Sequence, residues 1–383
     1  MTCDARLLAS VGARLLDYDL TLATGALDER TVTLAAEKID YACADLERRH
    51  LYVISSDGRP GVPGERHRLQ VFSLARNGRA LREVGTPHRL DQRALHVTID
   101  RAARHLLIAY GIPSVVEVWR LRADGTVEGR VSRVECGHFA HQVLLDEARG
   151  LAIVVARGAD VSAQRAEAPG SLQVFDYHDG TLTPRATVAP EAGYGFGPRN
   201  AALQPRGEWL CVSLERQNRL CVFGIGAAGV SPTPVWSMTT LAAPDNVRPR
   251  QLGGTLCVSP DGRYVYVANR ADHTVEAAGQ RVFDGGENSL AVFSMNPADG
   301  ALSLIEHADS GGFYPRTFAI DRSGTRLIVA NGKSMTVRDG DAVRDVPANV
   351  AVFDIAPSGR LTLLRANAID TGAQSLFWSD LLE

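Results

Sequence analysis

The chain has little lysine, few cysteines and no long run of apolar residues. Only two of its 41 basic residues are lysine, at positions 38 and 333, and the rest are arginine. Arginine binds carboxylate and phosphate groups with a fork of two donors, whereas Schiff-base chemistry has few candidates here. The six cysteines include no C-x-x-C pair, so a zinc knuckle is not supported. They are expected to be free thiols of the core, and a disulfide between Cys211 and Cys221 across a hairpin is a minor alternative.

The N-terminal segment and the overall charge exclude several classes of partner. Residues 1–19 carry Asp4 and Asp17 and have no long apolar stretch, so they predict neither a signal peptide nor a membrane span. A net charge of −3, with 45% hydrophobic and 22% charged residues, is typical of a globular protein without a nucleic-acid footprint. We therefore expect a cytoplasmic protein that binds a small molecule and uses no cofactor, no nucleic acid and no membrane.

A repeated phrase organises the chain. Alternating apolar residues with an aromatic recur seven times, at 15–20, 69–74, 116–121, 172–177, 220–225, 290–295 and 350–355. The mean spacing of the aromatics is about 56 residues, within the range of propeller blades. Period-2 alternation predicts a strand, and the Asp-Gly or Ser-Gly turns that follow most copies predict hairpins. A second apolar hairpin precedes each phrase, most plainly at 253–270 and 315–332, so two hairpins form a four-stranded antiparallel blade.

The two ends of the chain are complementary fragments of one blade. Residues 373–380 resemble an innermost strand with no second strand after it, and residues 4–10 resemble a second strand with no innermost strand before it. Pairing them completes the seventh blade and closes the ring without an open edge. The sequence thus predicts an all-β, seven-bladed β-propeller in which residues 1–383 form one domain. Two β-sandwiches, the alternative, would not explain the complementary ends.

The repeat also places charged residues together. The start of every innermost strand and the end of every second strand lie on the same face of a propeller. Aligned copies put these residues at the starts of the innermost strands: Asp40, Leu95, His141, Arg199, Gly254, Arg316 and Gln374. They put these at the ends of the second strands: Ser56, Gly111, Arg157, Glu215, Arg270 and Gly332. We expect Arg199, Arg270 and Arg316 to surround His141 and Glu215 in a basic central funnel.

Such a funnel suits chemistry on an anionic substrate. Arginines bind anions and polarise carbonyl groups, and a carboxylate or imidazole shielded from water suits general acid–base work. Hydrolysis or formation of a lactone fits this set, while the alternative is that the charges pair with one another along a solvated channel. A cation held by Glu215 with Asn200 or Asn269 is disfavoured by the basic surroundings, so we expect a metal-independent site.

Three long connections should lie on the same face as these charges. They span residues 158–170, 271–289 and 332–349, between the second and third strands of their blades. Long loops on one rim of a rigid scaffold commonly build a binding site, although they can also be ornaments of the surface.

Segments 195–215, 256–270 and 312–331 resemble the seven-bladed propeller lactonase family. They contain G-F-G-P-R, S-P-D-G-R-Y-V-Y-V-A-N-R and G-F-Y-P-R strings in that order. The family includes propeller-type 6-phosphogluconolactonases and a fungal 3-carboxy-cis,cis-muconate lactonizing enzyme. The resemblance places the family's cluster of one histidine, two arginines and one glutamate on His141, Arg199, Arg270 and Glu215. Asn200 stands where the family often has histidine, and we expect it to contact the substrate.

The resemblance implies a lactonase acting on an anionic sugar-acid or aromatic-catabolic lactone. Arg199 and Arg270 would bind the anion and the carbonyl oxygen, with help from Arg316. Glu215 would activate water and His141 would protonate the leaving ring oxygen, although these two roles could be exchanged. Two alternatives stay open at this point: a lactonizing cycloisomerase that runs the same site in reverse, and a non-enzymatic propeller that binds proteins through its rim.

Overall fold

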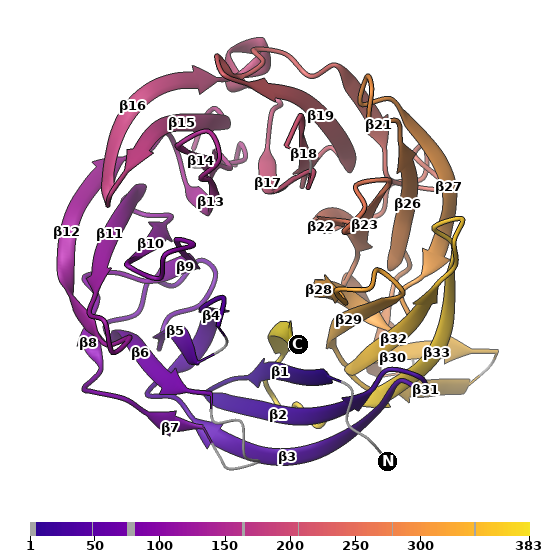
Figure 1. Ribbon diagram of the computed structural model, residues 1–383. Coiled ribbons are helices and arrows are strands. Elements are labelled where there is room, and N and C mark those ends of the chain that lie inside the picture. The colour runs from indigo at the N-terminus through magenta and orange to yellow at the C-terminus, as the bar shows by residue number, and fades with distance from the viewer. Residues whose placement is uncertain are drawn as a thin grey trace.

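The chain forms a ring of antiparallel sheets around a central channel (Figure 1). The structure is a computed structural model that describes residues 5–47, 49–74, 81–162, 165–205, 207–277, 279–340 and 342–383. Seven sheets of four or five strands form the blades, and two further two-stranded sheets lie in long connections. The predicted all-β, seven-bladed propeller is confirmed.

Each blade runs from an innermost strand that borders the channel to an outermost strand at the rim (Figure 1). The strands of each blade are given from the inside outward. The first complete blade consists of β4 (Lys38–Ala44), β5 (His50–Ser56) and β6 (His67–Ser73), with β7 (Arg82–Glu83) and β8 (His88–Arg89) at the rim. The second consists of β9 (Ala94–Ile99), β10 (His105–Tyr110), β11 (Val115–Leu121) and β12 (Val127–Glu135), and the third of β13 (Ala140–Asp146), β14 (Leu151–Ala156), β15 (Ser171–His178) and β16 (Thr181–Val188). The next three are β17 (Pro198–Leu203), β18 (Trp209–Leu214), β19 (Arg219–Gly226) with β20 (Gly229–Val230) and β21 (Trp236–Thr239); β22 (Leu252–Val258), β23 (Tyr264–Arg270), β26 (Ser289–Met295), β27 (Leu302–Asp309); and β28 (Phe313–Ile320), β29 (Arg326–Lys333), β32 (Asn349–Ile355), β33 (Leu361–Ala368).

The seventh blade joins the two ends of the chain. It consists of β34 (Leu376–Leu382), β1 (Ala5–Val11), β2 (Arg14–Thr21) and β3 (Ala26–Leu34), from the inside outward. Strand β34 pairs antiparallel with β1, so the last strand of the chain is innermost and the first strand lies beside it. The closure predicted from the complementary end fragments is confirmed: the pairing of β34 with β1 closes the ring.

The blades depart from the ideal unit mainly at the rim and in the connections. In two blades the outermost strand is broken into short pieces, β7 with β8 and β20 with β21. Two of the long connections carry hairpins of their own, β24 (Thr274–Ala277) with β25 (Gln280–Phe283) and β30 (Met335–Asp339) with β31 (Ala342–Val346). Strands β25 and β30 contact each other. In the described part of the chain the helical structure is one 3-10 turn, η1 (Pro190–Gly193).

The core consists of seven apolar clusters, one at each interface between neighbouring blades. Strands in the middle of a blade are covered on both faces, so they are continuously apolar rather than alternating. All six residues of β14 are buried, for example. The outermost strand β16 of the same blade is mostly exposed. Because every blade is packed on both sides, the innermost strands are held in fixed positions around the channel.

Two expectations concern cysteine and membrane crossing. The five described cysteines are free thiols, as the sequence predicts. The sulfur of Cys211 lies 4.0 Å from that of Met295, and the thiol of Cys221 donates to the hydroxyl of Ser237 at 3.4 Å, so these two cysteines face different partners. Within the described ranges, no helix has both the length and the apolar character needed to cross a bilayer.

Candidate active site

All seven innermost strands carry a β-bulge near their start. At each bulge the innermost strand has one residue more than the second strand, so the pairing register shifts there. The residues that lie in these shifts are Asp40, Leu95, His141, Arg199, Gly254 with Thr255, Arg316 and Phe377. A bulge releases one residue from regular pairing and re-aims its side chain. The repeated bulge therefore turns one position of every blade toward the channel.

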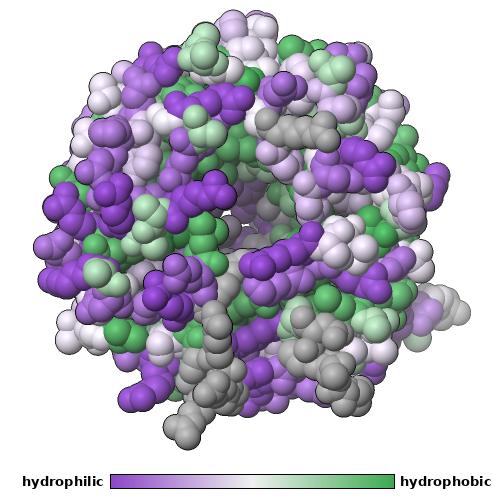
Figure 2. Space-filling view, in the orientation of Figure 1, coloured by the Kyte–Doolittle hydropathy of each residue, from purple (hydrophilic) through white to green (hydrophobic). Residues whose placement is uncertain are grey.

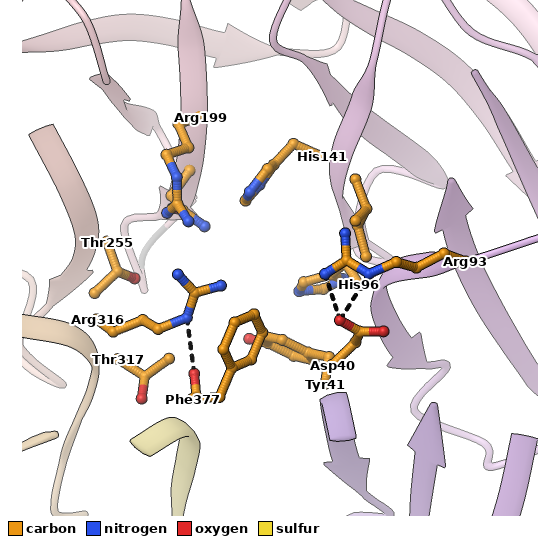
Figure 3. Close-up of a pocket in the computed structure, with 12 residues that line it drawn as sticks. Asp40, Tyr41, Arg93, His96, His141, Arg199, Thr255, Arg316, Thr317 and Phe377 are labelled. Atoms are coloured by element: carbon orange, nitrogen blue, oxygen red, sulfur yellow. Dashed lines mark hydrogen bonds and ion pairs between the residues drawn. The ribbon is translucent and has the colours of Figure 1, made fainter. Parts of the chain in front are cut away.

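The bulges converge on one pocket, here called the throat pocket, which has a cavity volume of about 60 Å³ and is partly open to solvent. The space-filling view shows one face of the ring hollowed at its centre, with hydrophilic side chains around the hollow (Figure 2). All seven blades contribute to the lining, which consists of Asp40, Tyr41, Arg93, Leu95, His96, His141, Arg199, Asn200, Thr255, Arg316, Thr317 and Phe377 (Figure 3).

Each blade has one aligned position at the pocket, and alignment of the repeats identifies that residue in five of the seven blades, with two corrections. Thr255 lines the pocket in place of Gly254, because the bulge of β22 spans both residues. Phe377 lines it in place of Gln374, which lies in the turn before β34 and donates its backbone N–H to Thr371. The C-terminal strand pairs with β1 at the other end of the chain, so no adjacent second strand fixed its register in the sequence.

Glu215 follows β18 and is held by three arginines. Its Oε1 forms an ion pair with Nε of Arg199 at 2.8 Å and accepts from Nη2 of Arg270, and its Oε2 accepts from Nε of Arg157. Burial alone would raise the pKa of this carboxyl, but the three guanidiniums outweigh that effect and hold the pKa well below its usual range. Glu215 is therefore ionised, and neither it nor Arg270 is among the residues that line the throat pocket.

The arginines of this region differ in what they can reach. Arg270 is 2% exposed, and its guanidinium lies over the ring of Tyr314 with 4.9 Å between Cζ and the ring centroid. Arg199 lines the pocket, and burial followed by the charge of Arg270 lowers its pKa to about 9. Its Nη1 donates to Oδ1 of Asn200, so Asn200 lies in the pocket and also orients Arg199.

Arg316 reaches the pocket from β28 and is fixed by the C-terminal strand β34. Its Nε donates to the carbonyl oxygen of Phe377 at 3.0 Å, and its guanidinium lies over the Phe377 ring at 3.5 Å from the centroid. Burial and the charge of Arg270 lower the pKa of Arg316 to about 10. Arg199 and Arg316 therefore face one pocket with their guanidiniums already positioned (Figure 3).

His141 points into the pocket between the arginines and the opposite wall (Figure 3). Its Nδ1 is buried without a hydrogen-bond partner among the described residues. Burial, followed by the charge of Arg199, lowers its pKa well below the usual value. The imidazole is thus neutral near pH 7.

The pocket also holds a second charged group, of which alignment of the repeats finds only Asp40. Arg93, which precedes β9, binds Asp40 on β4, and His96 lies beside them with its ring 4.4 Å from that of Tyr41. The aligned position of this blade is Leu95, so the blade had no polar residue at the expected place. The residues two before and one after the bulge carry the charge and the imidazole, and comparing those flanking positions would have found them.

The side chains considered as ligands for a cation, Glu215 and Asn269, already bind other groups of the protein. Both oxygens of Glu215 accept from guanidiniums. The amide of Asn269 is bound on both sides: its oxygen accepts from Thr240, and its nitrogen donates to the Thr240 carbonyl and to Ser289. These side chains therefore do not form a common set of ligands.

The sequence profile described as "Lactonase, 7-bladed beta-propeller" matches residues 9–339. The chain belongs to this family. The 6-phosphogluconolactonase of Bacillus subtilis is 24% identical over 367 residues, which cover 91% of this chain and 90% of that protein. The 6-phosphogluconolactonase of Serratia proteamaculans is 21% identical over 355 residues, with 91% and 90% covered.

Solved structures share the architecture over the whole length. The periplasmic gluconolactonase of Pseudomonas aeruginosa superimposes with a TM-score of 0.76 at 20% identity and covers 99% of both chains. A putative 6-phosphogluconolactonase from Bacteroides uniformis gives a TM-score of 0.75 at 17% identity and covers 100% of both. At such identities the likeness shows the fold. The cytoplasmic location expected from the sequence stays a prediction.

Proposed function

We propose that this chain is a lactonase that hydrolyses the ring ester of an anionic sugar-acid lactone in the throat pocket. The observation that carries the proposal is the convergence of Arg199, Arg316 and His141 on one pocket lined by all seven blades. The names of the relatives, 6-phosphogluconolactonase and gluconolactonase, support this substrate class.

In this proposal the two pocket-lining arginines bind negative charge. One guanidinium receives the anionic group of the substrate, and the other stabilises the oxyanion that forms when the carbonyl carbon is attacked. Glu215 and Asn200 orient Arg199, while the Phe377 carbonyl and ring orient Arg316. Donors fixed before the substrate binds need little reorganisation during the reaction.

The remaining roles follow from protonation state and access. His141 is neutral, so we assign it a hydrogen bond to the leaving ring oxygen rather than the role of a charged acid. We assign Glu215 and Arg270 to holding Arg199 in place instead of contacting the substrate, since both lie outside the pocket lining. Independence of metal stays a prediction, which turnover after treatment with a chelator checks.

The proposal is tested by acid release from matched lactones. Wild-type protein should hydrolyse 6-phosphoglucono-δ-lactone above the spontaneous rate and prefer it to uncharged glucono-δ-lactone. Arg316→Ala should reduce that preference, because it removes a guanidinium from the pocket, whereas Arg263→Ala should not. Arg263 is an exposed control, on the turn between β22 and β23.

Two results would count against hydrolysis. One is an unchanged rate of acid release for every anionic lactone in a panel that also contains muconolactones. The other is cyclisation of a carboxymuconate without hydrolysis of any sugar lactone, which would favour the cycloisomerase.

A further inference from the structure

One carboxyl in the throat pocket has an oxygen with no partner. Asp40 is the bulge residue of β4 and is 8% exposed. Arg93 directs two donors, Nε at 3.0 Å and Nη2, to the same oxygen, Oδ1. Oδ2 is buried and accepts no hydrogen bond from any described residue. A buried polar atom left without a partner in a pocket is a place where a ligand or water is expected to bind.

The arrangement differs from an ordinary buried ion pair in the same molecule. Asp17 of β2 is also buried and also paired with one main arginine, but Arg6 spans both of its oxygens, with Nε to Oδ1 at 2.7 Å and Nη2 to Oδ2 at 2.6 Å. Both oxygens of Asp17 are therefore satisfied within the protein. At Asp40, by contrast, Arg93 engages one oxygen, and Oδ2 has no hydrogen-bond partner among the described residues.

The charges around Asp40 leave it able to change protonation state near neutral pH. Burial raises its pKa to about 6, and the opposing charges of Arg93, Arg316 and Lys38 offset the effect only in part. The neighbouring imidazole of His96 is neutral, because burial lowers its pKa to about 3. A group with a pKa close to the working pH is the most effective general acid or base.

We propose that Asp40 is the general base of the hydrolysis, an assignment that rests on the proposed lactonase function. Oδ2 takes a proton from a water molecule as the water oxygen bonds to the lactone carbonyl carbon, while Arg199 stabilises the resulting oxyanion and Arg316 holds the anionic group of the substrate. The bond between that carbon and the ring oxygen then breaks. The proton passes from Asp40 to the ring oxygen, which His141 hydrogen-bonds, and the carboxylate is restored with a hydroxy acid as product.

Glu215, the carboxylate that the sequence favoured for this step, is less suited to it. Three guanidiniums occupy its two oxygens, and their charges hold its pKa so low that it is a weak proton acceptor. Asp40 has one arginine on one oxygen. In this proposal Asp40 transfers the proton, and Glu215 balances the charge of the arginines around it.

The test is the pH dependence of kcat and kcat/KM for wild type, Asp40→Asn and the matched control Asp17→Asn. Because the base must be ionised, wild-type kcat/KM should fall as pH drops through about 6. Asp40→Asn should lower kcat by ~100-fold or more with a small change in KM, and the acidic limb should disappear. Asp17→Asn also loses a buried, arginine-paired carboxylate, yet it should keep the limb and the wild-type kcat.

Different results would contradict either the assignment of Asp40 or the proposed lactonase function. If wild type is active and Asp40→Asn keeps both its kcat and its acidic limb, the assignment of Asp40 fails while the lactonase proposal stands. If wild type hydrolyses no lactone in the panel, the proposed function fails and the assignment falls with it. Should Asp40→Asn not fold, the wild-type profile still decides, since a flat kcat/KM between about pH 5 and 7 overturns the proposal.

Discussion

Asp40 and Glu215 are two buried carboxylates whose surroundings shift their pKa values in opposite directions. Glu215 lies between Arg157, Arg199 and Arg270, and its pKa is held well below the usual range. Asp40 has Arg93 on one oxygen, and burial raises its pKa to about 6. The comparison shows that the number and placement of guanidiniums, more than burial, decide whether a carboxyl acts as a counter-ion or remains available for proton transfer.

The largest effect should come from removing the carboxylate that three arginines share. Glu215→Gln leaves the buried Arg270 without its counter-ion, and breaking a buried ion pair in this way costs about 3–5 kcal/mol. Asp40→Asn frees a single guanidinium, so its cost should be smaller. Urea unfolding of both variants measures the difference, and equal losses would show that the two carboxylates are equivalent in stability.

The next largest effect should come from the loss of Arg199, which binds Glu215 and lines the pocket. Arg199→Ala removes a pocket-lining donor, and removal of one oxyanion donor typically lowers kcat by ~100- to 1000-fold. Steady-state kinetics with the anionic lactone check this, with Arg263→Ala as the exposed control. A change confined to KM would restrict Arg199 to holding the substrate.

A further effect concerns the imidazole of His141 in the throat pocket. His141→Ala should lower kcat by ~100-fold, because the leaving ring oxygen loses its hydrogen-bond donor. Since His141 is neutral near pH 7, the acidic limb of the profile should survive in the variant. Loss of the limb in His141→Ala would assign that titration to the imidazole and remove it from Asp40.

The smallest effect is on the pH dependence of stability, and its sign differs between the two carboxylates. Asp40 binds its proton more tightly in the folded state, so its contribution to stability is present at low pH and is lost as pH rises through about 6. Glu215 binds its proton less tightly when folded, so its contribution is present near neutral pH and is lost as pH falls below about 4.5. Melting curves between about pH 3 and 7 should therefore bring Asp40→Asn closer to wild type as pH rises and Glu215→Gln closer to wild type as pH falls. Parallel curves would contradict the opposite pKa shifts.

The repeat pattern predicts the fold and much of the site for a physical reason. Each blade is one copy of a unit that buries both faces, so its apolar phrases and turns are legible in the sequence. The same repetition puts the bulge at an equivalent place in every blade, which is why alignment finds His141, Arg199 and Arg316 at the pocket. It also reaches Asp40, although without a role for it.

What the sequence could not supply is the pairing between blades. Arg157 follows β14 and Arg93 precedes β9, and each binds a carboxylate on a neighbouring blade. Which arginine binds which oxygen depends on bulge geometry and side-chain reach. Phe377 was missed because β34 finds its partner strand at the opposite end of the chain.

The most direct measurement of the contrast is a carboxyl carbon-13 NMR titration of wild-type protein, with Asp40→Asn and Glu215→Gln used to assign the two signals. The account predicts that the Asp40 signal titrates with a midpoint at about pH 6 while the Glu215 signal stays ionised to the lowest pH at which the protein is folded. Titration of both carboxyls together near pH 4, as for exposed side chains, would contradict it.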